Sequence, residues 1–148
     1  CNLLWWQPQP SGALALQHVD FGGREAAIGA AHLFWPWPHR QPQQISEMRE
    51  RLRANGRTEL PMIFAGDLNA TPWSHSAKRI ASFLGAKRQT FPGGSWLYHE
   101  LPPQHTQRFG LPIDNVMARG IEVTKIGTLA PFGSDHLAVR AEFGFAVE

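Results

Sequence analysis

The apolar and polar positions of this chain follow two periods, which predicts a mixture of strands and helices. Leu60–Phe64 is a short apolar run that Pro61 opens and Gly66 stops, so we expect a buried strand there. Asp67 and Asn69 follow directly. Residues two apart in a strand point the same way, so we expect both side chains to project together from its carboxyl end.

The first half of the chain predicts a hairpin. Ala13–Val19 and Glu25–Leu33 have strand patterns and flank the turn sequence DFGG. Two helices are expected as well. One covers Pro42–Asn55, and the other ends at Leu84 after a start at which Thr71 or Ser74 can be the N-cap. The next segment, Lys87–Gly110, is rich in Pro, Gly and Gln and has no sustained period, so we expect a long loop.

The last third is rich in β-forming residues. Strands are expected at Pro112–Ala118, Ile121–Leu129 and His136–Phe145. Amphipathic helices combined with strands favour an α/β sandwich in which helices cover sheets packed face to face.

Acids beside apolar strands are the candidate chemistry. A carboxylate such as Asp67 can hold a hard cation or take a proton from water, and the Asn69 amide can donate to a phosphate oxygen. The alternative is an Asx-turn in which both side chains bind local backbone. Farther along, Asp114 lies within LPIDNVM, and Asp135 and His136 follow a turn in FGSDHLAV. In each of these segments an apolar strand lies beside a turn and carries an acidic residue with Asn or His next to it.

Composition narrows the classes of protein. The chain has 148 residues, a net charge of +2 and one Cys. A single Cys excludes an internal disulfide framework and a Cys-based metal site. The small net charge does not indicate a surface that binds a long stretch of nucleic acid. No stretch approaches the roughly 18 apolar residues of a membrane span.

The motifs GDLN, PIDNV and GSDHLAV, with His32 at a strand end before them, together resemble the endonuclease/exonuclease/phosphatase family of metal-dependent phosphoesterases. The resemblance implies the α/β, four-layer α/β/β/α sandwich of DNase I-like proteins. It covers residues from about 32 to 143, so residues 1–148 are expected to form a single domain, the C-terminal part of the family fold, incomplete at the N-terminus. Family members carry an Asn and a metal-binding Glu before the matching His. Here only Asp20 and Glu25 precede His32, and both lie beside the hairpin turn.

The resemblance also implies roles. Asp67 would activate water, Asn69 would donate to the phosphate or align the nucleophile, and His136 would be held by Asp114. His32 would donate to a second phosphate oxygen. Asp135, together with Asp67, would bind Mg²⁺ or Mn²⁺, which carboxylates suit better than zinc.

The function expected is phosphodiester hydrolysis, and the alternative is a non-catalytic phosphate- or partner-binding domain that kept the fold. In a third interpretation the acids only cap turns. Nucleic acid, phospholipid and inositol phosphate all stay open as substrates. Trp35 and Trp37 are expected to pack as a rim or to stack on substrate. The resemblance implies that the loop carrying Trp96, Tyr98 and His99 borders the substrate, and the alternative is a surface flap without direct contact. The PWP and GDLNATPWS motifs resemble bacterial members that often follow membrane spans, so a membrane tether upstream is a further expectation.

Overall fold

The structure is a computed structural model that describes residues 3–7, 13–38, 40–54, 59–89, 93–97 and 102–145. Its strands are β1 (Leu3–Gln7), β2 (Ala13–Asp20), β3 (Glu25–His32), β4 (Met62–Asp67), β5 (Lys87–Gln89), β6 (Asp114–Arg119), β7 (Glu122–Thr128) and β8 (Val139–Gly144). Its helices are α1 (Gln41–Ala54), α2 (His75–Leu84), the 3-10 turn η1 (Pro103–His105) and the short α3 (Thr106–Phe109).

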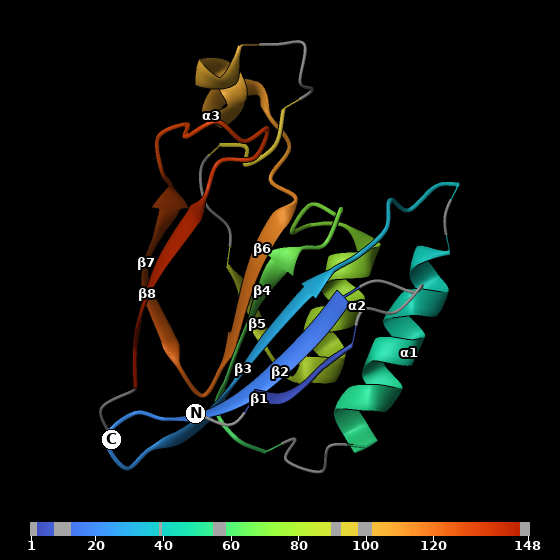
Figure 1. Ribbon diagram of the computed structural model, residues 1–148, viewed down its shortest axis with the longest axis vertical. Helices are drawn as coiled ribbons and strands as arrows, with labels where there is room; N and C mark the ends of the chain where they lie inside the picture. The colour runs from blue at the N-terminus through green and yellow to red at the C-terminus, as the bar shows by residue number, and fades with distance from the viewer. Residues whose placement is uncertain are drawn as a thin grey trace.

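A six-stranded sheet in the order β1-β2-β3-β4-β6-β5 forms the centre of the described residues. Strands β3 and β4 are parallel, and the other neighbours in this sheet are antiparallel. Helices α1 and α2 cover one face, and β7 and β8 form a separate two-stranded sheet on the other side (Figure 1). The α/β class is confirmed, and the described residues form layers of helices, large sheet and small sheet.

The expected hairpin is present. Strands β2 and β3 pair along their whole length, from Ala13 opposite His32 to Asp20 opposite Glu25. The turn closes because the Asp20 carboxylate accepts a hydrogen bond from the Gly23 amide.

The two expected helices are also present. Ser74, not Thr71, caps α2, since its hydroxyl oxygen accepts from the Ala77 amide at 3.1 Å. Gly85 ends that helix in the left-handed conformation with φ of 62°. Helix α1 begins at Gln41, one residue before the expected start, and the expected end at Asn55 lies outside the described residues.

The core lies between the helices and the large sheet. Apolar side chains of both helices pack against central strands, and Phe64, Ile80 and Met117 are almost completely buried. Burial of apolar surface at about 25 cal/mol per Å² stabilises this layer pair and holds β4 at the centre of the sheet.

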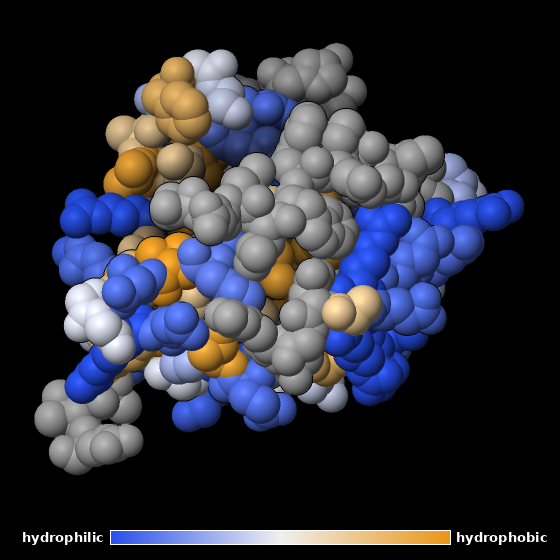
Figure 2. All heavy atoms as spheres, turned by 60° about the horizontal axis from the view of Figure 1, so that its bottom comes forward, coloured by the Kyte–Doolittle hydropathy of each residue, from blue (hydrophilic) through white to orange (hydrophobic). Residues whose placement is uncertain are grey.

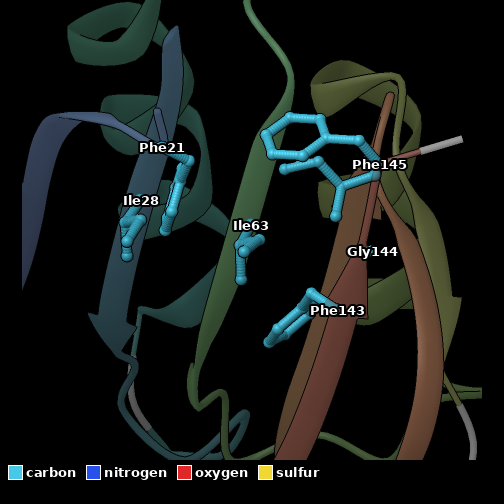
Figure 3. A pocket seen from close by; sticks show the side chains of 7 residues that line it. Phe21, Ile28, Ile63, Phe143, Gly144 and Phe145 are labelled. Carbon is cyan, nitrogen blue, oxygen red and sulfur yellow. The ribbon is translucent and has the colours of Figure 1, made fainter. Parts of the chain in front are cut away.

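A second apolar space of about 410 Å³, open to solvent, lies between the two sheets and is lined by Phe21, Ile28, Ile63, Ile121, Phe143, Gly144 and Phe145. In Figure 3 Phe21, Ile28 and Ile63 lie on the side of the large sheet, and Phe143 and Phe145 lie opposite them on the side of β8. The Phe21 and Phe145 rings meet edge to face at 6.0 Å. In Figure 2 the side that carries α1 is mostly hydrophilic, whereas apolar side chains reach the surface on the side of the small sheet.

Some expected elements differ from the structure. The segment Lys87–Gly110 is not only loop, because β5 pairs with β6 and η1 and α3 follow. Such short elements have too few residues to show a period and form through tertiary contacts. The expected strands at Pro112–Ala118 and His136–Phe145 begin later, at Asp114 and Val139, so His136 lies before its strand. No helix in the described part of the chain is long and apolar enough to cross a membrane.

Candidate active site

Three strands bring acids and histidines to one end of the large sheet. Asp67 ends β4, and the antiparallel register places Asp114, the first residue of β6, directly opposite it. His32 ends β3, which runs parallel to β4, and the Leu33 amide just beyond it donates to the Asp67 carbonyl at 2.9 Å. This end lies at the top of Figure 1, where the loop between β7 and β8 also arrives.

Gly66 permits the close approach of β3 to β4 just before Asp67. Its φ is +145°, and a Cβ atom built there would lie 2.0 Å from the Ala31 carbonyl oxygen. No other residue type avoids that clash, so the glycine of the GDLN motif is required for the geometry of the site.

A turn, and not an extended strand, brings Asp67 and Asn69 together. Asn69 has a φ of 45°, and its backbone amide donates to Asp67 Oδ1 at 2.8 Å. The expectation that both project from one strand is therefore wrong in mechanism, because β4 ends at Asp67. This is the Asx-turn alternative, and it leaves Asp67 Oδ2 facing the histidines.

The Asn69 side chain is only 6% exposed, and its amide nitrogen donates within the protein. It binds the Leu33 carbonyl at 2.7 Å and lies 3.4 Å from Asp67 Oδ2. Both amide hydrogens are thus directed to protein acceptors, which ties the end of β3 to the turn after β4.

Two imidazoles flank the Asp67 carboxylate. Its Oδ2 lies 3.4 Å from His32 Nε2 and 3.9 Å from His136 Nε2. His136 Nδ1 is 2.8 Å from Asp114 Oδ2, so this carboxylate orients the ring. The result is a row in the order Asp114, His136, Asp67 and His32.

The environment raises the pKa of Asp67 above its ordinary value. Partial burial is the largest cause, because it penalises the charged carboxylate. The hydrogen bond from the Asn69 amide lowers the pKa, the neighbouring Asp114 charge raises it, and the two histidines lower it. Burial prevails, so Asp67 is a stronger base than an exposed carboxylate.

The segment around Ser95 connects β6 to the loop that carries His136. The Ser95 hydroxyl, fully buried, accepts from the Asp114 amide at 3.1 Å, and its carbonyl accepts from the Leu137 amide at 2.7 Å. The next residue, Trp96, donates from Nε1 to Asp135 Oδ2 at 3.2 Å. Asp135 is therefore held beside the pocket by an indole.

These side chains line a pocket of about 420 Å³. Its walls are His32, Leu33, Phe34, Trp35, Asp67, Asn69, Trp96, Ile113, Asp135 and His136. Of the catalytic and metal-binding residues expected from the sequence, Asp114 is absent from this lining and lies behind His136. Trp37 is also absent from the lining and is 85% exposed. Tyr98 and His99, expected at the border, lie outside the described residues.

Comparison with known protein families identifies the family to which this chain belongs. The model of the Endonuclease/Exonuclease/phosphatase family matches residues 4–136. The chain belongs to this family. A search of curated protein sequences finds no significant match.

Solved structures of similar fold include several proteins of this family. The human nocturnin catalytic domain with bound sulfate superposes with a TM-score of 0.70 at 19% identity, covering 91% of this chain and 53% of that one. A mannosyl-6-phosphatase of Bacteroides thetaiotaomicron gives 0.71 at 18% identity, covering 90% of this chain and 57% of that one. For D. rerio TDP2 in complex with a single-strand DNA product the TM-score is 0.64 at 14% identity, covering 96% and 68%. This family member thus spans about half the length of the first two proteins and shares the DNase I-like fold.

Buried amides missed in the sequence analysis hold the pocket of this family member in place. Gln41 Nε2 donates to the Phe34 and Leu68 carbonyls at 2.6 and 3.1 Å. Gln44 accepts from the Phe34 amide at 2.9 Å through its Oε1. The signal was available, because both glutamines fall on the same face of α1 as Ile45. Asn115, the residue after Asp114, is 2% exposed and also donates to backbone carbonyls.

The described residues do not by themselves fit a complete metal centre. Among them, no cluster of three or more His, Cys, Asp or Glu side chains is arranged to hold an ion. Asp67 and Asp135 are the carboxylates that line the pocket. A hard cation such as Mg²⁺ needs about six oxygen ligands, several of which can be water, so this pair could supply only part of the set.

Proposed function

We propose that this chain carries the water-activating and phosphate-binding side of a phosphoesterase. The observation that supports this most strongly is the convergence of Asp114, His136, Asp67 and His32 on one pocket from separate parts of the fold. Hydrolysis of a phosphate ester needs an activated water, neutralisation of charge on the phosphoryl oxygens and stabilisation of the leaving oxygen. The row of four residues contains a carboxylate that can activate water and two imidazoles that can donate to phosphoryl and leaving oxygens.

Asp67 is the base in this proposal. A carboxylate whose pKa is raised by burial holds a proton more readily at neutral pH than an exposed one. Its Oδ1 accepts the short bond from the Asn69 backbone amide, whereas Oδ2 accepts a long bond of 3.4 Å from the Asn69 side chain and faces the histidines. Oδ2 is therefore the oxygen that would accept the proton of a water. Asn69 then acts as a positioning residue, because its own amide hydrogens are directed to protein acceptors.

The histidines face the phosphate. His136 donates from Nδ1 to the Asp114 carboxylate, which leaves its Nε2 directed toward Asp67 and the pocket. A protonated ring held this way can donate to a phosphoryl or leaving oxygen. His32, with a side chain 67% exposed, is available to donate to a second oxygen.

We also propose that the reaction requires Mg²⁺ or Mn²⁺. Asp67 and Asp135 would be ligands, and the remaining ligands would come from outside the described residues or from water. Such an ion would neutralise charge on the phosphate oxygens.

The substrate class follows from what the similar proteins have in common. By their names, one is a mannosyl-6-phosphatase, one was solved with sulfate and one with a single-strand DNA product. A tetrahedral anion or phosphate ester is the shared chemistry. Nucleic acid, phospholipid and inositol phosphate all remain candidates under this proposal.

The alternative is a phosphate- or partner-binding domain without catalysis. The incomplete set of metal ligands among the described residues favours it. In that case inorganic phosphate would bind at the histidines, and no ester would be cleaved.

The test is hydrolysis of bis-p-nitrophenyl phosphate with Mg²⁺ or Mn²⁺, with and without chelator. We expect turnover that chelator abolishes and that Asp67→Asn abolishes as well. Asp114→Asn should lower kcat by about 10²- to 10⁴-fold, because His136 loses the carboxylate that orients it. In a protein that already carries His136→Ala, the same change should have little further effect.

Folding of each variant is checked by circular dichroism. No turnover by a folded protein that still binds inorganic phosphate would support the binding domain. Turnover that survives Asp67→Asn would refute the assignment of the base.

A further inference from the structure

Two tryptophans from distant parts of the chain form one wall of the pocket, here termed the aromatic corner. Trp35 follows β3, and Trp96 lies just before the short 3-10 turn and α3. Their ring centroids are 5.4 Å apart with an interplanar angle of 67°. Rings at this angle form a corner and not a closed sandwich, so a further planar group can stack on one ring and meet the edge of the other.

The corner is held rigidly next to the reacting groups. Trp96 forms backbone bridges to Leu111 and His136, and its indole nitrogen donates to Asp135. The Trp96 backbone is therefore held between the Leu111 and His136 segments, and its ring is held by Asp135. Such a fixed ring costs little conformational entropy when a ligand binds it.

The Trp35 side of the corner is fixed from helix α1. Gln44 and Gln41 bind the backbone amide and carbonyl of Phe34, the residue directly before Trp35. Pro36 follows and restricts the backbone of Trp35. Trp35 nevertheless keeps 39% of its surface exposed, within a pocket whose apolar part includes the buried Leu33 and Ile113.

We propose that the aromatic corner is a subsite for a planar aromatic group attached to the phosphate that the histidines bind. The inference rests on the proposed function for the position of the phosphate. A nucleobase and a simple aryl group share the flat π face that such a corner recognises, and stacking on tryptophan accepts any base. The corner selects esters with an aromatic group over those with only sugar or alkyl groups.

A purely structural role for the tryptophans makes the opposite prediction, and Trp37 provides the matched control. It lies in the same Pro-flanked loop, is 85% exposed and is not part of the pocket lining. If the corner only packed the loop, ligands with and without an aromatic ring would bind equally.

The experiment compares binding of AMP, phenyl phosphate and ribose 5-phosphate by calorimetry in the presence of Mg²⁺. AMP and ribose 5-phosphate share the phosphate and the sugar and differ only in the base. We expect AMP to bind at least about 5-fold more tightly than ribose 5-phosphate, within the range of one base stacked on an aromatic ring. Phenyl phosphate shows which aromatic group is recognised. If it binds as tightly as AMP, any aryl group suffices, and if it binds more weakly than AMP, the subsite prefers a nucleobase.

Substitutions of Trp35 and Trp37 test whether the preference for AMP depends on the aromatic corner. Trp35→Leu should abolish the preference for AMP over ribose 5-phosphate, and Trp35→Phe should retain part of it. Trp37→Leu should leave all three affinities unchanged. Equal binding of AMP and ribose 5-phosphate, no binding of either, or an equal loss in Trp37→Leu would overturn the subsite.

The outcome separates the two proposals. Hydrolysis of bis-p-nitrophenyl phosphate without any preference for AMP leaves the phosphoesterase standing and removes the subsite. A preference for AMP without hydrolysis leaves the subsite standing and removes the phosphoesterase.

Discussion

At the scale of single residues, Asp67 combines two roles that the sequence presented as alternatives. One carboxylate oxygen closes the turn to Asn69, and the other faces His32 and His136. The turn holds the carboxylate in a partly buried position, and burial raises its pKa. A local structural bond therefore prepares the group for the chemistry proposed for it.

The raised pKa predicts how stability depends on pH. The folded protein binds the Asp67 proton more tightly than the unfolded chain does, so the free energy of unfolding falls as pH rises from the ordinary carboxyl range through the raised pKa. Asp67→Asn removes this fall and should make the protein more stable at neutral pH although inactive. Urea unfolding of chelator-treated protein across the acidic to neutral range measures it. Identical pH dependence in the two proteins would contradict the prediction.

At the scale of elements, strand pairing decides which groups meet. The parallel β3–β4 pair places His32 near Asp67, and the antiparallel β4–β6 pair places Asp114 opposite it. Helix α1 then fixes the loops beyond these strands through its buried glutamines. The site is thus as rigid as the sheet that carries it.

Gly66→Ala tests the close approach of β3 and β4. The added Cβ would overlap the Ala31 carbonyl, and φ is positive, so we expect a loss of about 2 kcal/mol or more of stability and loss of activity. Gly127→Ala in β7 is the control, because a Cβ there meets nothing within 4 Å. Chemical denaturation of both variants compares them, and equal stability would refute the requirement for glycine.

Gln41→Ala tests the amide support. The Phe34 and Leu68 carbonyls would each lose a partner, which we expect to cost about 1–3 kcal/mol and to lower activity. Gln43→Ala serves as the control, because it removes an exposed glutamine whose side chain bonds to Glu47 one helical turn away. Thermal unfolding and kcat are measured for both. A Gln41→Ala protein as stable and active as the Gln43→Ala protein would show that the support is dispensable.

At the scale of the whole molecule, the two faces of the large sheet differ. Helices cover one face and bury it, whereas in the part of the chain that the structure describes the other face meets the small sheet across the apolar space of Figure 3. Ile28 and Phe143 on this side are each 37% exposed. Apolar surface of this kind lowers solubility.

Replacing both Ile28 and Phe143 with threonine should therefore reduce concentration-dependent light scattering. Threonine keeps the preference for strand conformation, so the sheets should persist. Phe132→Thr is the control, because Phe132 is 69% exposed but does not line the space. An equal effect of both changes would mean that exposure alone, and not this face, governs solubility.

Much of the fold was predictable because the hydrophobic period and the turn residues are local features of the sequence. The DFGG turn predicted the hairpin, and the helical period over Pro42–Asn55 predicted α1, in which Ile45, Met48 and Leu52 are buried on one face. The weakest prediction concerned Lys87–Gly110, where β5 exists only through its pairing with β6. Three residues carry no period, so the strand depends on its neighbour.

Local sequence patterns were enough to name the candidate groups, since the motifs around Asp67, Asp114 and His136 contain the residues and the strands beside them. How these groups meet depends on the three-dimensional fold. The Asp114–His136 distance, the orientation of Asp67 Oδ2 and the aromatic corner all depend on segments far apart in the chain. Strand register and buried amides set these geometries, and both are long-range properties that no local pattern contains.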